Sequence, residues 1–144
     1  MSVRVYLDAG VLIAAAGSET GGSRAVLNLS KTFPIKLLIS DLVLAEVQEN
    51  LAKNFASEKQ EKFASFLDEL EFEYIELSQN QFLEGAVINP KDIHVYSGFK
   101  LSKSNFLLTL DKGFIGQVNE QEGSKLAITP GELIGKLPNF FKNC

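Results

Sequence analysis

The apolar residues of this chain fall into five short runs, and the segments between the runs carry apolar residues at helical spacing. The runs are rich in aliphatic and aromatic residues and predict strands over residues 3–8, 35–40, 72–77, 105–111 and 125–129. The segments between them predict helices over residues 10–17, 22–32, 40–56 and 91–103, and a further helix that starts near residue 57. Strands that alternate with helices form parallel sheets through right-handed crossovers. We therefore predict an α/β fold, with a central parallel sheet of about five strands and helices on both faces.

The length of 144 residues predicts a single domain over residues 1–144. A hydrophobic share of 45% with a charged share of 22% is typical of a folded globular protein. Residues 130–144 are interrupted by glycine and proline, which predicts a short helix and a loosely attached C-terminal tail.

The composition also restricts the cellular compartment and the classes of binding partner that we expect. The chain has no run of about 18 apolar residues and no signal-peptide pattern at its start, so we expect neither membrane insertion nor secretion. Cys144 is the one cysteine, which excludes internal disulfides and favours the cytoplasm. A net charge of −4 argues against a broad basic face for nucleic acid, although metal ions between carboxylates and phosphates would still permit binding.

Four acidic residues recur where the predicted strands end. Asp8 follows the first strand and Asp111 the fourth, Glu46 lies on the helix after the second strand, and Asp92 opens the helix before the fourth. The carboxyl ends of parallel strands share one edge of a sheet, where ligands bind. Carboxylates gathered there repel one another unless a cation offsets their charge, and Mg²⁺ and Mn²⁺ prefer oxygen ligands. The pattern therefore predicts a divalent metal site.

With their surrounding motifs, these residues resemble the PIN domain family of magnesium-dependent ribonucleases. The four motifs read VYLDAGVLI, LISDLVLAEV, NPKDIHVYSGF and LLTLDKGF, and the resemblance covers roughly residues 3–129. It implies a PIN-like nuclease domain in which a Mg²⁺- or Mn²⁺-dependent site hydrolyses RNA phosphodiester bonds. The implied catalytic and metal-binding residues are Asp8, Glu46, Asp92 and Asp111. Ser40 and Thr109 would orient these carboxylates or contact a phosphate.

The same resemblance implies partners. Toxin components of toxin–antitoxin pairs are prominent in the family, and they are commonly homodimers that a small antitoxin protein holds inactive. We therefore expect an RNA substrate, a homodimer and a possible antitoxin partner.

Two departures from the family pattern leave other functions open. Gly10 stands where the family usually has asparagine or serine, and Gly113 where a further acid often follows. A PIN-like binding module that has lost activity is therefore an alternative to the ribonuclease. A phosphatase-type hydrolase is a weaker alternative, because LDAGVLI is similar to its aspartate loop but position 10 lacks the second aspartate.

Each acid also has a purely structural interpretation. Asp8 could cap a helix, Asp111 could start a turn, Asp92 could be a favourable charge at a helix start, and Glu46 could lie on a solvated helix side. His94 follows Asp92 by two positions, which in a regular helix places it on the opposite side, so we interpret it as structural.

Overall fold

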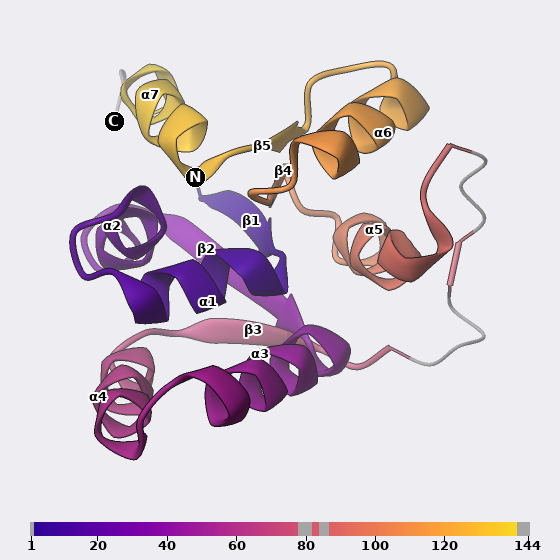
Figure 1. Cartoon of the computed structure of the whole chain (residues 1–144). Coiled ribbons are helices and arrows are strands. Elements are labelled where there is room, and N and C mark those ends of the chain that lie inside the picture. The colour runs from indigo at the N-terminus through magenta and orange to yellow at the C-terminus, as the bar shows by residue number, and fades with distance from the viewer. Residues whose placement is uncertain (1, 78–81, 84–86, 141–144) are drawn as a thin grey trace.

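The computed structural model describes residues 2–77, 82–83 and 87–140 and shows one parallel five-stranded sheet with helices on both faces (Figure 1). The strands are β1 (Val3–Leu7), β2 (Ile35–Ser40), β3 (Phe72–Ile75), β4 (Phe106–Leu108) and β5 (Ala127–Ile128). The helices are α1 (Ala9–Gly17), α2 (Gly22–Leu29), α3 (Asp41–Asn54), α4 (Ser57–Asp68), α5 (Ile93–Leu101), α6 (Lys112–Glu122) and α7 (Pro130–Phe140), with a 3-10 turn η2 (Pro90–Asp92) before α5. The predicted α/β fold is confirmed.

The strand order β3-β2-β1-β4-β5 determines where a ligand site can form. From β1 the chain adds β2 and β3 on one side and then crosses back to add β4 and β5 on the other. The order therefore reverses between β1 and β4, where Leu7 lies beside Leu108. In open parallel sheets the binding crevice lies beyond the carboxyl ends of the strands at this reversal.

Both faces of the sheet are covered, so most residues of the central strands are apolar. Val5, Leu37 and Leu107, on three adjacent strands, are each 0% exposed. Figure 1 shows α1 to α4 on one side of the sheet and α5 and α6 on the other, as right-handed crossovers require. In the described residues no helix combines the length and the apolar character needed to cross a bilayer.

The predicted strands exist, but the fourth and fifth are shorter than the patterns over 105–111 and 125–129 suggested. Asn119 explains the short β5. Its Oδ1 accepts hydrogen bonds from the N–H groups of Leu126 and Ala127 at 2.9 and 2.8 Å, and its Nδ2 donates to Ala127 O at 3.0 Å. The side chain thus satisfies backbone groups that a further strand would otherwise pair with.

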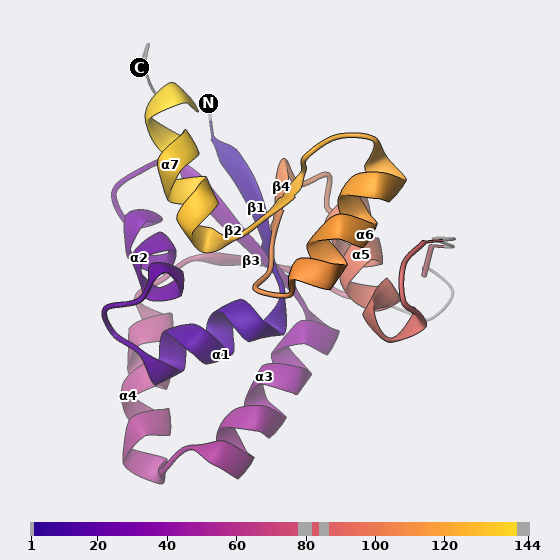
Figure 2. The same ribbon diagram turned by 45° about the horizontal axis from the view of Figure 1, so that its top comes forward.

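Helix α7 is the short helix predicted within residues 130–144, but it is packed against the domain and not loosely attached. It lies beside α2 (Figures 1 and 2) and buries Leu133 and Leu137, while the Phe140 ring meets the Phe106 ring edge-on at 5.4 Å between centroids. Pro130 is the first residue of α7, where the missing N–H breaks no helical hydrogen bond, so proline there starts a helix instead of ending one. Residues 141–144 lie outside the described residues.

Candidate active site

Asp8 lies at the point where the strand order reverses. Its backbone N–H donates to Leu108 O at 3.0 Å, which continues the β1–β4 pairing by one residue. Its Oδ1 accepts from the Ala9 N–H at 2.7 Å, so Asp8 caps α1. One carboxylate oxygen is therefore fixed by the helix start, as the structural interpretation of this residue predicted.

Thr109 joins the two acids that follow β1 and β4. It is fully buried, and its Oγ1 donates to Asp8 Oδ2 at 2.8 Å and accepts from the Asp111 N–H at 3.2 Å. Its own N–H donates to Ile128 O at 3.1 Å, which ties this link to β5. Thr109 therefore orients the Asp8 carboxylate and positions the Asp111 backbone.

Asp111 begins α6. Its Oδ1 accepts from the Phe114 N–H at 3.1 Å, while Oδ2 has no hydrogen-bond partner in the described part of the chain. The residue is exposed, so one oxygen serves the helix and the other remains available to a ligand.

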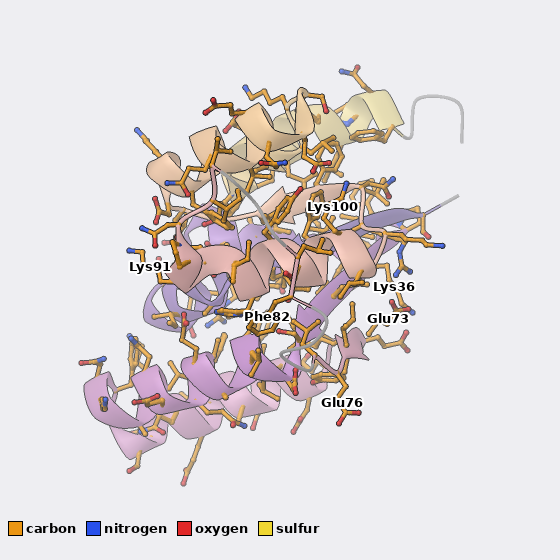
Figure 3. All side chains as sticks on the ribbon, turned by 90° about the vertical axis from the view of Figure 1, so that its right-hand side faces the viewer. Lys36, Glu73, Glu76, Phe82, Lys91 and Lys100 are labelled. Carbon is orange, nitrogen blue, oxygen red and sulfur yellow. The ribbon has the colours of Figure 1, made fainter. Side chains whose placement is uncertain are left out.

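Asp92 and Glu46 come from helices on opposite faces of the sheet. Asp92 ends η2 and precedes α5 with φ −105° and ψ 0°, and its carboxylate makes no capping hydrogen bond. Figure 3 shows the neighbouring Lys91 at this end of α5 and Lys100 toward the other end. Glu46 is exposed in the second turn of α3, the helix that Ser40 caps.

The pKa values show that these acids share one electrostatic environment. Partial removal from water is the main cause of the raised pKa values of Asp8 and Asp92, and it also acts on the carboxyl group of the more exposed Glu46. The negative charge of Asp8 further raises the pKa values of Glu46 and Asp92, and the charge of Asp111 raises those of Asp8 and Asp92. The structure thus brings the four acids close enough for their charges to interact.

His94 lies closer to the acids than its spacing from Asp92 suggested. Its electrostatic interaction with Asp8, Glu46 and Asp92 lowers the pKa values of these acids against the effect of burial. Its Nδ1 is buried and has no hydrogen-bond partner among the described residues. Sequence reasoning dismissed this residue because it treated Asp92 as part of a regular helix, whereas Asp92 belongs to the 3-10 turn η2.

Ser40 occupies a fully buried position at the end of β2. Its Oγ accepts from the Val43 N–H at 3.1 Å, and no carboxylate of the described residues bonds to it. The nearby Tyr6 is also fully buried, and burial raises its pKa to about 12, although Ser40 acts in the opposite direction. Ser40 therefore supports α3, which carries Glu46.

The donor set is chemically suited to a hard divalent cation, because all four acids offer oxygen ligands. Within the described ranges, no three histidine, cysteine or acidic side chains stand close enough together to hold a metal ion as they are. The four acids form an acidic rim, in which the negative charge of one acid raises the pKa of its neighbours.

Comparison with known proteins identifies the family. The model of the PIN domain family matches residues 5–116, a range that includes all four acids. A search of curated proteins gives no match. Among solved structures, a chain in the crystal structure of VapBC2 from Rickettsia felis, bound to a DNA fragment from their promoter, is 22% identical with a TM-score of 0.56. The similarity covers 76% of this chain and 89% of that chain, and at this identity it shows the fold alone.

Proposed function

The chain belongs to the PIN domain family, whose members are generally nucleases, and we propose that it is a Mg²⁺- or Mn²⁺-dependent endoribonuclease that hydrolyses RNA phosphodiester bonds. The observation that carries the proposal is the mutual influence of the acids at the reversal of strand order. The negative charges of Asp8 and Asp111 raise the pKa of Asp92, and the charge of Asp8 raises that of Glu46. A cluster of acids that disfavour one another's charge is stabilised when a cation binds.

Asp8, Glu46, Asp92 and Asp111 would hold the cation. When bound, a divalent ion activates water as a nucleophile and neutralises the charge that develops on the phosphate oxygens. The chain's own contribution is to keep the ligands in place. Thr109 restrains the carboxylate of Asp8 and the backbone of Asp111 through one hydroxyl group. Fixed neighbours of this kind strengthen metal binding and activity.

The test is metal-dependent cleavage of single-stranded RNA by the purified chain. With Mn²⁺ present, we expect wild type to cleave and Asp8→Asn to be slower by about a hundredfold or more, because metal catalysis contributes several kcal/mol. Asparagine is as good a helix cap as aspartate, so the variant keeps the start of α1. Asp68→Asn makes the same charge change on the exposed surface at the end of α4 and should cleave like wild type.

Two further measurements separate the alternatives. Mn²⁺ should raise the melting temperature of wild type and not of Asp111→Asn, because a ligand that binds only the folded state adds about 2.7 kcal/mol at a hundred times its Kd. Binding of Mn²⁺ without RNA cleavage would favour the binding module that the departures at Gly10 and Gly113 left open. Hydrolysis of a small phosphate ester in place of RNA would favour the phosphatase-type reaction.

We also propose that the chain is the toxin of a toxin–antitoxin pair. Support comes from the PIN family itself and from the similarity in fold to a chain of the VapBC2 complex. The acidic rim around Asp8 and Asp92 would suit an arginine side chain from a small antitoxin, since guanidinium groups bind carboxylates in a bidentate way. A gene for a small DNA-binding protein beside the gene for this chain would support the pairing. The homodimer and the cytoplasmic location remain predictions from the sequence.

A further inference from the structure

The structure assigns a second binding feature beside the acids. We propose that a cleft between the starts of α2 and α7 holds a nucleobase of the RNA strand next to the cleaved phosphodiester, an inference that rests on the proposed ribonuclease function. The cleft has a volume of about 270 Å³ and adjoins the acids through Leu110, which lines it and lies between Thr109 and Asp111 in the chain.

The walls of the cleft are apolar. Leu110 is 47% exposed, which makes it one of the few large hydrophobic side chains open to solvent in the described residues. Pro130 and Ala14 line the same cleft. The starts of α2 and α7 lie close together here, because a Cβ at Gly22 would be in ordinary contact with Gly131 N at 3.8 Å. An exposed apolar wall beside a catalytic site suits the flat, weakly polar face of a nucleobase.

One edge of the cleft carries hydrogen-bond donors without acceptors. Gly21 caps α2 without a side-chain hydrogen bond, so the N–H groups of Gly22 and Ser23 have no acceptor in the described residues. Ser23 lines the cleft and is only 6% exposed, and its hydroxyl has no hydrogen-bond partner in the same part of the chain. The fully buried side-chain atoms without a partner in the described residues are Tyr6 Oη and His94 Nδ1, so the Ser23 hydroxyl keeps its access to the cleft and is available to donate to a ligand there.

Charge decides between a nucleobase and a phosphate. The cleft is lined by uncharged residues, and its boundary is the start of α7, where Glu132 accepts hydrogen bonds from the N–H and Oγ1 of Thr129 at 3.3 Å each. The other oxygen of Glu132 pairs with Lys125 Nζ at 2.8 Å, so this charge is already offset. No lysine or arginine lines the cleft in the described residues, so a phosphate would find no cationic partner there. A neutral base fits both features, because its ring contacts the apolar wall and a ring carbonyl accepts from Ser23. Bases that carry such a carbonyl, namely uracil, cytosine and guanine, should bind better than adenine.

The test is binding of a fluorescein-labelled single-stranded RNA, measured by fluorescence anisotropy with Mn²⁺ in the Asp8→Asn background, where hydrolysis is suppressed. Ser23→Ala and Leu110→Ala should each weaken binding about tenfold, which is within the range measured for loss of a base contact. Leu101→Ala is the matched control, because Leu101 is 42% exposed at the far end of α5 and should leave binding unchanged. Melting temperatures of all variants check that each one is folded.

RNAs with a single abasic position identify the occupant. Removing the base next to the cleavage position should weaken binding to the Asp8→Asn protein about tenfold. In the variant that also carries Leu110→Ala, removing the same base should cause no further loss of affinity. If a neutral methylphosphonate at that position weakens binding while the abasic RNA binds normally, the cleft holds a phosphate and the proposal is wrong. Unchanged affinity in both cleft variants would also overturn it.

The two proposals fail separately. If the otherwise wild-type chain cleaves RNA while the cleft variants bind like the parent, the base subsite is wrong and the ribonuclease stands. If binding depends on the base and on Leu110 but no RNA is cleaved, the cleft stands and hydrolysis is wrong. An absence of both binding and cleavage removes both proposals.

Discussion

Replacing Gly98 by alanine should separate α5 from β1 and thereby disturb the acidic rim. A Cβ at position 98 would collide with Tyr6 Oη and lie 2.5 Å from Cζ and 2.9 Å from Cε2. Tyr6 cannot move aside, because it is 0% exposed in a central strand and pairs with Leu38 on one side and Leu107 on the other. The helix must therefore shift.

The expected change in the free energy of unfolding of Gly98→Ala has two opposing contributions. Overpacking of a core typically lowers the free energy of unfolding by about 1–3 kcal/mol, and contact with three atoms of a fully buried ring belongs at the upper end. Alanine in place of glycine inside a helix adds about 1 kcal/mol. We expect a net loss of about 2 kcal/mol, which lowers the melting temperature of a domain this size by about 4–8 °C.

Urea and thermal unfolding measure this loss, and a second glycine provides the control. Gly116 lies in α6, and a Cβ added there would meet nothing beyond the backbone of its own helix within 4 Å, so Gly116→Ala should raise the free energy of unfolding by about 1 kcal/mol. Since α5 begins directly after Asp92, Gly98→Ala should also reduce the Mn²⁺-induced rise in melting temperature. Equal stability of the two variants would refute the close-packing argument.

Tyr6→Phe shows how much of the clash is with the hydroxyl group. The Tyr6 hydroxyl is buried and makes no hydrogen bond of good geometry within the described residues, so its removal alone should leave stability unchanged or raise it by about 1 kcal/mol. In the Gly98→Ala background the gain should be larger, because the nearest clashing atom is then gone. Additive effects of the two substitutions would show that the contact is not responsible.

Three other predictions follow from the same geometry. Thr109→Val keeps the shape of the side chain but removes the hydrogen bonds to Asp8 and Asp111, so RNA cleavage should fall about 10–100-fold at an unchanged circular-dichroism spectrum, and wild-type activity would contradict this. Without metal, the raised pKa of Asp8 means that the folded state binds the proton of this carboxyl more tightly than the unfolded state does, so the ionised carboxyl lowers the free energy of unfolding at neutral pH. This penalty disappears as the pH falls through the folded-state pKa toward the unfolded-state value. Urea unfolding should therefore show that the free energy of unfolding rises more for wild type than for Asp8→Asn when the pH is lowered from neutral to mildly acidic. Phe140→Ala removes the edge-on contact with Phe106 and should lower the free energy of unfolding by about 2 kcal/mol, whereas a detached tail would give no change in a urea titration.

Helix α6 was absent from the sequence-based prediction, although its signals were present. Asp111 and Gly123 mark its two ends, the first as a cap and the second with φ 69° in the left-handed conformation that favours glycine. Phe114 and Val118 bury one side at helical spacing. Two internal glycines and a mostly polar composition concealed the pattern, because helix propensity is a weak guide when packing determines the outcome.

The alternation of strands and helices in a parallel sheet was accessible from sequence, but the strand order and the close approach of α5 to β1 were not. Gly98 looked like a residue that weakens a helix. Glycine is needed at position 98 because of tertiary packing: Tyr6 of β1 occupies the space that a side chain at this position would need. Contacts between residues 92 positions apart in the chain leave no periodic signal, so a single sequence cannot reveal them.

The structural and functional interpretations of the aspartates do not exclude each other. Asp8 and Asp111 each cap a helix with one oxygen, Oδ1, which bonds to the N–H of Ala9 or Phe114. This use of Oδ1 holds each carboxylate in one orientation and leaves Oδ2 to face the site, where Thr109 bonds that of Asp8. A capped carboxylate therefore loses little further side-chain entropy when a ligand binds. Since asparagine also caps helices, substitution by asparagine removes the charge while it keeps the orientation, which makes Asp8→Asn and Asp111→Asn direct tests of the charge itself.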